Sequence, residues 1–392
     1  MDDLLLVPGP TNVPEEVLRE AARRLVSHRA GRFHELYDDL REKLKEILGT
    51  SGEVVVLTTS GTGAVEAMIA CLVSRGCKAL VPSTGEFSSR LIETLRIHGA
   101  RVVEVEAEVG SAPSLSEVLE KIESENPDVV AAVYNDTSPG VRLSYLKELC
   151  KAAKSVGALT LVDAVSAVGG EELRVDEWGI DAIAGASQKC LAAPPGVSFV
   201  ALSSEAVNSL RERPDTFYLD LHKYLRFAEK SETPFTPAVT LFYALRAALD
   251  RILRVGVDNW IADHAIRAQA LYSSLEKLSL KPFVKPEFRS RTVLSFRLPG
   301  EVKVSALKRS LAFKYGIYVA GGLGHLKDEI IRVGNMGSLK LRDMISLVAA
   351  IGLELLGMGV KVSIDEALSS LKDEVEKLGF PRSRELEGSW AA

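Results

Sequence analysis

The chain of 392 residues contains little cysteine and little histidine, with four of the former and six of the latter. The histidines show neither a His-Glu-x-x-His nor a His-x-His spacing, so a metal hydrolase is disfavoured and no metal site is predicted. The cysteines lack the paired spacing of zinc or disulfide frameworks, which favours structural thiols in a reduced, cytoplasmic setting. They are Cys71, Cys77, Cys150 and Cys190.

Long apolar runs and a strong charge of either sign are also missing. No run of about 18 or more apolar residues occurs, so no segment is predicted to cross a membrane. The apolar part of the N-terminus, Leu4-Leu5-Leu6, is short and follows two aspartates, which does not fit a signal peptide. A formal net charge of -5 gives no basic surface for nucleic acid. Neither a nucleic acid nor a membrane is therefore an expected partner.

What the sequence does contain is typical of a globular enzyme, with 46% hydrophobic and 26% charged residues. Residues 15–48 are helical in pattern, with apolar positions that include Val17, Leu25 and Leu36. Short apolar runs then alternate with helical patterns, which predicts crossover units and a largely parallel sheet. Strands are expected at about 53–58, 78–82, 101–105, 128–134, 158–162, 181–185 and 197–202. The predicted fold class is α/β, with a large domain built on a mostly parallel seven-stranded sheet flanked by helices.

The pattern changes near Pro234-Phe235-Thr236-Pro237. A long helix is expected over 238–276, with a break near Gly256, and a smaller α+β segment follows. Its elements are expected at 292–297, 305–315, 330–333, 339–357 and 363–379. Two domains are favoured because one core rarely supports a chain of this length. The predicted division is an N-terminal arm at 1–14, a large domain at 15–260, a small C-terminal domain at 261–382 and a loose tail at 383–392.

Two charged residues stand close to the ends of predicted strands. Asp163 follows the apolar run 158–162, and Lys189 follows the run 181–186. Ligands bind outside the carboxyl ends of parallel strands, and unpaired charge is costly to bury, so a ligand that uses both residues is expected. Pyridoxal 5′-phosphate needs an amine for a Schiff base and a carboxylate that faces its pyridine nitrogen. The pair therefore predicts this cofactor.

A phosphate group also needs a binding site. Gly61-Thr62-Gly63 follows a predicted strand and begins a helix, where small residues let backbone N–H groups approach an anion. The same residues begin a Gly-x-Gly-x-x-Gly dinucleotide pattern, but Glu66 replaces the third glycine and no acidic residue ends the next strand, 79–82. An NAD-linked dehydrogenase is therefore the weaker hypothesis.

Longer segments surround these residues, at 161–170, 179–181, 187–189 and 193–196. They resemble class V aminotransferases of the fold-type I pyridoxal-phosphate enzymes, and most closely the serine–pyruvate and alanine–glyoxylate branch. The resemblance extends from Pro8-Gly9-Pro10-Thr11 to Arg332 and is most specific around Asp163 and Lys189. It implies a large cofactor-binding domain, a smaller C-terminal domain, and a homodimer with sites at the subunit interface.

The resemblance also implies which residues bind the phosphate group. Thr62, Gly63 and Ala64 match the phosphate pocket, and Gln188 should assist them. Thr236 matches a position that reaches the phosphate of the neighbouring subunit's cofactor, although it could equally be an ordinary turn residue between prolines.

Three further positions match contacts to the cofactor ring. Phe87 matches the aromatic residue that stacks on the pyridine ring, with an ordinary core role as the alternative, and Val165 should cover the other face of the ring. Thr137 can hydrogen-bond the ring oxygen. The neighbouring segment departs from the family pattern, which leaves the substrate preference open. Its departures are Tyr134, Asp136 and Pro139, where relatives usually have His, Glu and Thr.

Arg332 lies inside a predicted apolar strand, where its guanidinium group needs partners. A bidentate clamp on the substrate α-carboxylate would use its planar shape. The alternative is a salt bridge within the small domain. Weaker rivals for the clamp are Arg289, Arg291 and Arg297.

These roles predict transamination of a small amino acid, alanine or serine, to a 2-oxo acid, glyoxylate or pyruvate, with ping-pong kinetics. Lys189 is expected to form the Schiff base and move the α-proton, while Asp163 keeps the pyridine nitrogen protonated. One alternative is an aminotransferase for aspartate, another dicarboxylate or phosphoserine. A distal anion could then be bound by Arg29, Arg32 or Arg90.

Two further alternatives fit the sequence less well. A cysteine desulfurase needs a cysteine on a loop of the C-terminal half, and no cysteine follows Cys190. From a different class, a non-catalytic regulatory protein that binds pyridoxal phosphate would have little need of Arg332.

Overall fold

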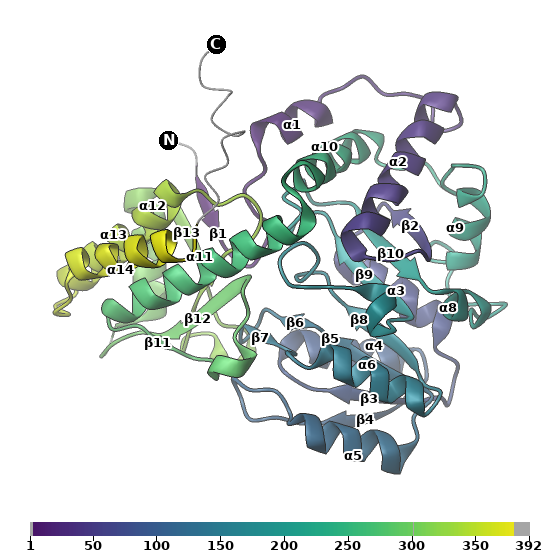
Figure 1. Ribbon diagram of the computed structural model, residues 1–392, viewed down its shortest axis with the longest axis horizontal. Coiled ribbons are helices and arrows are strands. Elements are labelled where there is room, and N and C mark those ends of the chain that lie inside the picture. Colours follow the sequence, from purple (N-terminus) through teal and green to yellow (C-terminus); the bar gives the residue numbers. More distant parts are fainter. Residues whose placement is uncertain (1–2, 301, 380–392) are drawn as a thin grey trace.

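The computed structural model describes residues 3–300 and 302–379 and arranges them around two main β-sheets (Figure 1). The larger sheet has the spatial order β2 (Glu53–Leu57), β10 (Ser198–Leu202), β9 (Ala182–Ala186), β8 (Leu159–Asp163), β5 (Val129–Val133), β3 (Lys78–Pro82) and β4 (Arg101–Val105). Only β10 runs antiparallel to its two neighbours, and the other pairs in this sheet are parallel. The prediction of a mostly parallel seven-stranded sheet is confirmed.

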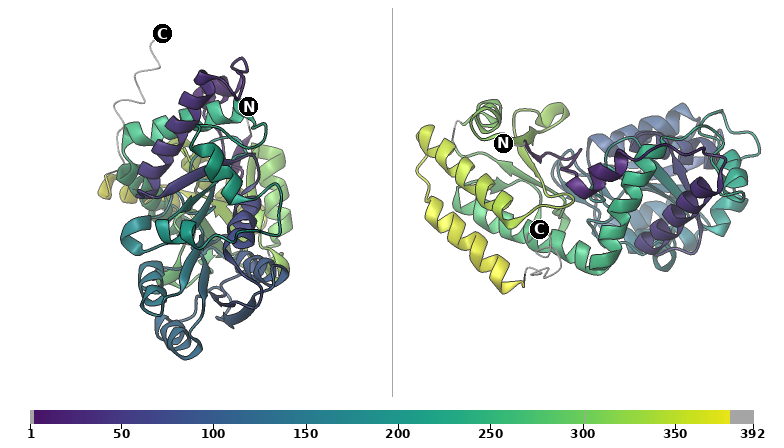
Figure 2. Two further views of the ribbon diagram at one scale, coloured as in Figure 1. Left: turned by 90° about the vertical axis from the view of Figure 1, so that its right-hand side faces the viewer. Right: turned by 90° about the horizontal axis from the view of Figure 1, so that it is seen from above.

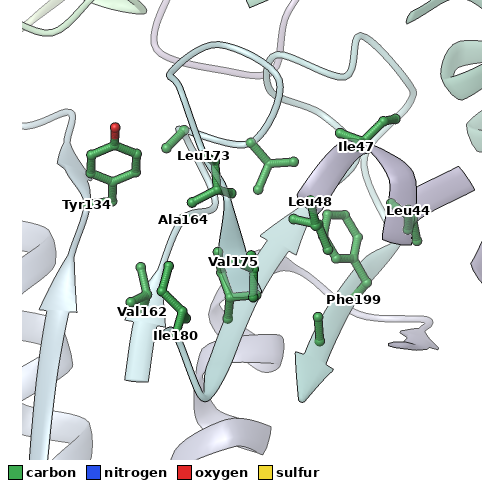
Figure 3. Close-up of a cluster of buried hydrophobic side chains, with 14 of the residues drawn as sticks. Leu44, Ile47, Leu48, Tyr134, Val162, Ala164, Leu173, Val175, Ile180 and Phe199 are labelled. Carbon is green, nitrogen blue, oxygen red and sulfur yellow. The ribbon is translucent and has the colours of Figure 1, made fainter. Parts of the chain in front are cut away.

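Helices cover both faces of the larger sheet, which explains why its strands are apolar throughout rather than alternating. One face packs against α1 (Glu15–Ala21), α2 (Gly31–Leu48), α5 (Leu115–Glu125), α6 (Leu146–Ser155), α7 (Val175–Trp178) and α10 (Val239–Val255). The other face packs against α3 (Gly61–Leu72), α4 (Glu86–Ile97), α8 (Ser204–Asn208) and α9 (Leu221–Ala228). Figure 3 shows the first of these cores, in which Leu44 and Leu48 lie beside Phe199. Each such buried side chain contributes about 1.5–3 kcal/mol.

The smaller sheet has five strands and its own apolar core. Its order is β1 (Leu4–Leu6), β13 (Ile317–Gly321), β14 (Ile331–Gly334), β12 (Val293–Arg297) and β11 (Lys281–Pro282). The helices that contribute to this core are α11 (Val257–Lys277), α12 (Val304–Tyr315), α13 (Leu341–Gly357) and α14 (Ile364–Lys377). Short elements complete the chain: β6 (Asn135–Asp136), β7 (Val141–Arg142) and the 3-10 turns Pro286–Phe288 and Gly324–Leu326. Figure 2 shows α13 and α14 (yellow) at the end of the molecule away from the larger sheet.

The break near Gly256 is confirmed, because this residue separates α10 from α11 and has a φ of 89°. The prediction of helical structure throughout residues 15–48 is wrong. Residues 22–30 are not helical, and Leu25 is 70% exposed rather than part of an apolar stripe. Both α1 and α2 pack against α10. The chain therefore has to turn between them, which the local periodicity does not reveal.

Three strands of the smaller sheet were not predicted: β1, β13 and the two-residue β11. Leu4–Leu6 belongs to the expected N-terminal arm, yet it pairs in parallel with β13, so Leu4 lies opposite Ile317. In β13, buried Ile317 and Val319 flank exposed Tyr318, an alternation too short to stand out in the sequence.

The division of the chain at residue 260 stays a prediction. Helix α11 spans that position, with Trp260 in the core of the larger sheet and Leu271 in the core of the smaller one. The predicted loose tail, 383–392, lies outside the described residues. The four cysteines are free thiols, and all but Cys77 are buried. Among the described residues, no helix is long and apolar enough to cross a membrane.

Candidate active site

A pocket lies at the carboxyl end of the larger sheet, between the first turns of α3 and α4 and the loops after β5, β8 and β9. It is lined by Thr62, Val65, Phe87, Arg90, Leu91, Thr94, Val133, Asn135, Thr137, Asp163, Val165, Ser166 and Lys189. Six of the eleven residues predicted from the sequence therefore line one pocket. They come from segments that are up to 127 positions apart, because parallel strands bring their carboxyl ends to one edge of the sheet.

Asp163 is the last residue of β8 and lines this pocket. Its Oδ1 accepts a hydrogen bond from the backbone N–H of Val165 at 3.0 Å. Burial raises the pKa of Asp163 to about 6, partly opposed by the Val165 hydrogen bond, and the nearby carboxylate of Asp136 adds to the rise while Lys189 opposes it. The site therefore disfavours the ionised carboxylate unless a positive charge is placed beside it.

Lys189 lies on the loop between β9 and β10. Ser187 holds the start of this loop, since its N–H donates to Val197 at 3.0 Å and its hydroxyl donates to the carbonyl of Pro194 at 2.6 Å. The Nζ of Lys189 donates to the carbonyl oxygen of Pro8. Burial lowers the pKa of Lys189, which favours the neutral amine that a nucleophile or base requires.

The start of α3 forms the predicted phosphate end of the pocket. Thr62 is exposed and lines the pocket, whereas Ala64 is fully buried and packs in the core. The N–H of Gly63 donates to the N-cap hydroxyl of Ser60 at 3.4 Å. The side-chain oxygen of Gln188 is buried without a hydrogen-bond partner among the described residues. Thr236 is exposed and lies outside the pocket lining of this chain.

Phe87, Val165 and Thr137, the three residues predicted to contact the cofactor ring, all line the pocket. Asp136, which stands where relatives usually have Glu, has a structural role. Its Oδ2 accepts hydrogen bonds from the N–H groups of Phe87 at 3.1 Å and Ser88 at 3.0 Å, so it caps the first turn of α4. Asp136 therefore fixes the position of Phe87 and does not itself line the pocket.

Arg332 lies in β14 with 5% of its surface exposed. Its Nε donates to the carbonyl of Gly321 at 2.7 Å and its Nη1 to the carbonyl of Thr137 at 2.8 Å, and burial lowers its pKa to about 10. No carboxylate among the described residues pairs with it, so the salt bridge considered as an alternative is not formed. The three other arginines considered for the carboxylate clamp each have an acidic neighbour. The pairs are Arg289 with Glu276, Arg291 with Glu171, and Arg297 with Glu329.

The sequence interpretation missed Asn135, which also lines the pocket. Its Nδ2 donates to the hydroxyls of Ser166 at 2.9 Å and Thr292 at 2.8 Å, while its buried Oδ1 has no partner among the described residues. An asparagine that directly follows a strand in a parallel sheet is a signal that could have found it.

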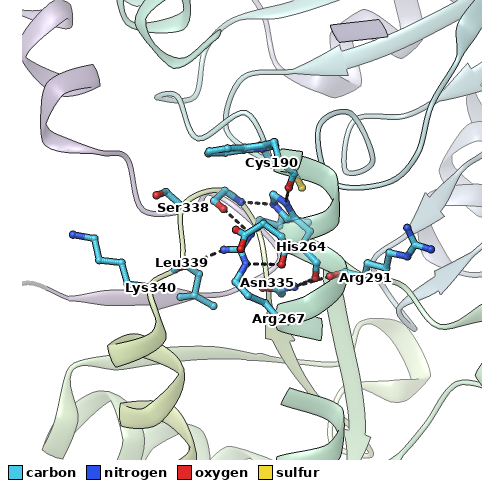
Figure 4. A network of polar contacts seen from close by, with 12 residues as sticks. Cys190, His264, Arg267, Arg291, Asn335, Ser338, Leu339 and Lys340 are labelled. Carbon is cyan, nitrogen blue, oxygen red and sulfur yellow. Dashed lines mark hydrogen bonds and ion pairs between the residues drawn. The ribbon is translucent and has the colours of Figure 1, made fainter. Parts of the chain in front are cut away.

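A second missed feature is the polar network that supports the Lys189 loop (Figure 4). His264 of α11 accepts a hydrogen bond from the N–H of Gly337 at 3.1 Å, and Arg267 donates to the carbonyl of the same glycine at 3.0 Å. Burial and the charge of Arg267 keep the pKa of His264 well below its usual value, so the imidazole is neutral. Trp260 donates to the carbonyl of Cys190 at 3.2 Å. Helix α11 thus ties the segment after β14 to the lysine loop.

Comparison with known proteins agrees with this geometry. The model of the family described as aminotransferase class-V matches residues 4–332. An uncharacterized aminotransferase of Methanocaldococcus jannaschii is 36% identical over 92% of this chain and 94% of its own length.

Two crystal structures share the fold over most of both chains. The ureidoglycine–glyoxylate aminotransferase of Bacillus subtilis superimposes with a TM-score of 0.91 at 27% identity, covering 95% of this chain and 98% of that one. The alanine–glyoxylate aminotransferase of Nostoc sp. superimposes with a TM-score of 0.87 at 31% identity, covering 91% and 96%.

Proposed function

Because the chain belongs to the class V aminotransferases, enzymes that depend on pyridoxal 5′-phosphate, we propose that it transfers the amino group of alanine or serine to glyoxylate or pyruvate. The observation that carries the proposal is that Asp163 and Lys189 line one pocket. The similarity to an alanine–glyoxylate and a ureidoglycine–glyoxylate aminotransferase supports a small uncharged donor and glyoxylate as acceptor.

The residues of the pocket fit the cofactor. Burial raises the pKa of Asp163, so a protonated ring nitrogen would supply the positive charge that favours its ionised form. The buried side-chain oxygen of Gln188 has no hydrogen-bond donor among the described residues, and the first turn of α3 offers the exposed Thr62 for an anion. When bound, pyridoxal phosphate supplies the carbonyl carbon that carries the amino group and a ring that delocalises the electron pair left at the substrate α-carbon.

The residues of the chain then have distinct roles. Lys189 would hold the cofactor through its side-chain nitrogen, and its free amine would act as the base that takes the proton from the substrate α-carbon and as the acid that gives it back. Asp163 holds the proton on the ring nitrogen. Arg332 binds the substrate α-carboxylate, since its guanidinium group has no carboxylate partner among the described residues.

The other residues hold and orient the cofactor. Phe87 and Val165, which line the pocket, would cover the two faces of its ring, and Thr137 would bind the ring oxygen. Thr62, Gly63, Ala64 and Gln188 form the phosphate end. Since one amino acid must leave as its oxo acid before the next oxo acid enters, ping-pong kinetics follow.

We also infer a homodimer in which Thr236 reaches the phosphate group bound to the other subunit. Thr236 is exposed and follows Phe235, whose ring stacks on Tyr218 at a centroid distance of 5.1 Å. Tyr218 donates to the carbonyl of Thr58, just before α3, and its neighbour Phe217 is 72% exposed. An apolar surface beside the phosphate end suits a second copy of the chain. Light scattering should give twice the chain mass of 42.4 kDa, and an active monomer would contradict the dimer.

The absorption spectrum of the cofactor-loaded protein tests the proposed reaction. L-alanine, L-serine and L-aspartate are added separately in the absence of an oxo acid. Loss of the visible band of the lysine-bound cofactor, with growth of the pyridoxamine phosphate band, is expected with alanine or serine. A response to aspartate alone would contradict the small donor, and a spectrum unchanged by every donor would contradict transamination.

A further inference from the structure

The N-terminal segment enters the smaller sheet as β1 and then crosses to the active site. After Leu6 the backbone passes so close to β14 that a Cβ on Gly334 would overlap the carbonyl of Val7. Thr11 fixes the far end of this crossing, because its N–H donates to the carbonyl of Gln188 at 3.2 Å and its hydroxyl donates to the carbonyl of Met336 at 2.9 Å. Residues 7–11, here called the crossing segment, are therefore held between the lysine loop and the segment after β14.

A side-chain clamp joins Leu5 and Asn12, which lie on either side of the crossing segment. The amide of Asn12 accepts a hydrogen bond from the N–H of Leu5 and donates one to the carbonyl of the same residue, both at 3.0 Å. Because Leu5 is paired with Tyr318 in the sheet, the clamp connects the crossing segment to β13. The clamp therefore holds Pro8 and Gly9 in place relative to β13.

Within the crossing segment, two residues meet the reactive lysine. The Nζ of Lys189 donates to the carbonyl oxygen of Pro8, 181 positions earlier in the chain. Gly9 has a φ of 105°, and a Cβ built on it would lie 2.6 Å from Nζ and 2.7 Å from Cδ of Lys189. Only glycine leaves room for the lysine in this position.

We infer that the crossing segment is part of the catalytic site: the Pro8 carbonyl holds the Lys189 nitrogen whenever that nitrogen is not bonded to the cofactor, and Gly9 leaves the space it needs. The inference rests on the proposed role of Lys189 as the tethering residue. It makes Pro8 and Gly9 positioning residues for the proton-transfer step.

A backbone carbonyl suits this role for a chemical reason. It accepts hydrogen bonds but has no proton to give, so it binds the lysine through an N–H and leaves the lone pair of the neutral amine available to take a proton. After the proton is taken, the ammonium group still has an N–H for the same carbonyl. The contact can therefore hold Lys189 in both protonation states at about the same place.

Stability measurements without added cofactor test the contact itself. Gly9→Ala, Lys189→Ala and the double variant are unfolded with urea as full-length chains. Gly9→Ala should lower the free energy of unfolding. In the Lys189→Ala background this loss should be about half as large or less, since the overlap with the lysine side chain disappears while the strain of a positive φ at residue 9 remains. Gly31→Ala is the control, because an added Cβ there meets no atom within 4 Å, and it should show no coupling to Lys189. Equal losses in the two backgrounds would overturn the inference.

A second experiment tests the contact during turnover and leaves Gly9 unchanged. Thr11→Val removes the hydroxyl that binds Met336, and Thr11→Ser keeps it. With alanine deuterated at the α-carbon, Thr11→Val should slow the decay of the visible band about tenfold and increase its isotope effect, because Lys189 is misplaced for proton transfer. Thr11→Ser should restore both values. Identical isotope effects in the two variants would overturn the inference.

The two proposals fail in different ways. If Lys189→Ala kept the visible band and turnover, the role of Lys189 itself would be wrong. If the band and turnover depend on Lys189 but the two Thr11 variants behave alike, only the role of the crossing segment is wrong.

Discussion

The guanidinium group of Arg332 donates to the backbone carbonyl of Thr137, a residue 195 positions earlier in the chain. This hydrogen bond of 2.8 Å connects β14 of the smaller sheet to the loop after β5, at the edge of the pocket. The position of the proposed carboxylate-binding group is thereby fixed relative to Asp163 and Lys189, although Arg332 itself does not line the pocket. Closely positioned groups of this kind keep a substrate aligned for reaction.

Substitution of Arg332 tests this arrangement. Arg332→Lys keeps a positive charge but loses the planar pair of donors, so kcat/KM for alanine should fall about 10- to 100-fold, mainly through a higher KM. Steady-state kinetics measure the change. Arg297→Lys is the matched control, because Arg297 is exposed and lies 3.5 Å from Glu329, and it should behave like the unsubstituted enzyme. Unchanged kinetics of Arg332→Lys would exclude Arg332 as the α-carboxylate ligand.

Replacement of the tethering lysine should be decisive. Lys189→Ala removes both the covalent attachment and the base that moves the α-proton, so turnover should be lost and the visible absorption of the lysine-bound cofactor should not form. Activity assays and absorption spectra measure the two effects. Lys147→Ala, a surface lysine paired with Glu177, is the control that should keep both. Retained turnover in Lys189→Ala would disprove the assignment.

The raised pKa of Asp163 predicts a pH-dependent stability of the protein without added cofactor. Burial raises this pKa from 3.8 to about 6, so the neutral form is favoured on folding and the ionised form is disfavoured. Burial of this side chain therefore takes nothing from the free energy of unfolding below about pH 4. The loss grows to about 3 kcal/mol as the pH rises past 6. Asp163→Asn should increase the free energy of unfolding at pH 8 and change it little at pH 4.

Asp176 provides a control of opposite sign. Burial opposes ionisation there, but hydrogen bonds from Thr50 and Ser51 outweigh it and lower the pKa. Asp176→Asn should therefore destabilise the protein at pH 8, with a smaller effect in acid as the native carboxylate also becomes protonated. Urea titrations at both pH values measure both variants. A stabilisation by Asp163→Asn that was equal at pH 4 and pH 8 would contradict the raised pKa.

The larger sheet offers a test of packing below the pocket. A Cβ on Gly185 in β9 would overlap the ring of Phe199 in β10, and both residues are enclosed by the core. Gly185→Ala should therefore lower the free energy of unfolding by about 1–3 kcal/mol. Gly357→Ala, where an added Cβ meets no atom within 4 Å, should change it by less than about 0.5 kcal/mol. Combining Gly185→Ala with Phe199→Leu should recover part of the loss if the ring causes it.

Much of the site could be predicted because its residues stand at the ends of strands that the sequence marks clearly. Asp163 follows a run of buried residues in β8, and the glycines before Ala64 mark the start of α3 after β2. Strand ends in a parallel sheet share one edge, so the order of elements along the chain was enough to expect Asp163 and the Lys189 loop at that edge. The positions of Thr62 and Phe87 in the site were implied by the family resemblance.

Other features were not visible because they depend on partners far away in the chain. The role of Asp136 as the cap of α4 requires Phe87 and Ser88 beside it, 49 and 48 positions earlier. The turn between α1 and α2 depends on their common packing against α10. Periodicity reports only which face of an element is apolar, and not which other element covers it.

The sequence by itself determined the alternation of strands and helices, the family, and the lysine and aspartate that define the pocket, because these follow from short-range pattern and residue chemistry. Only the tertiary structure decided which groups the two charged residues meet. The contact of Lys189 with Pro8 and that of Arg332 with Thr137 each join positions more than 180 residues apart. Such contacts form because the packing of the two sheets brings side chains close to backbone carbonyls from distant parts of the chain. No short-range pattern in the sequence indicates which groups will meet.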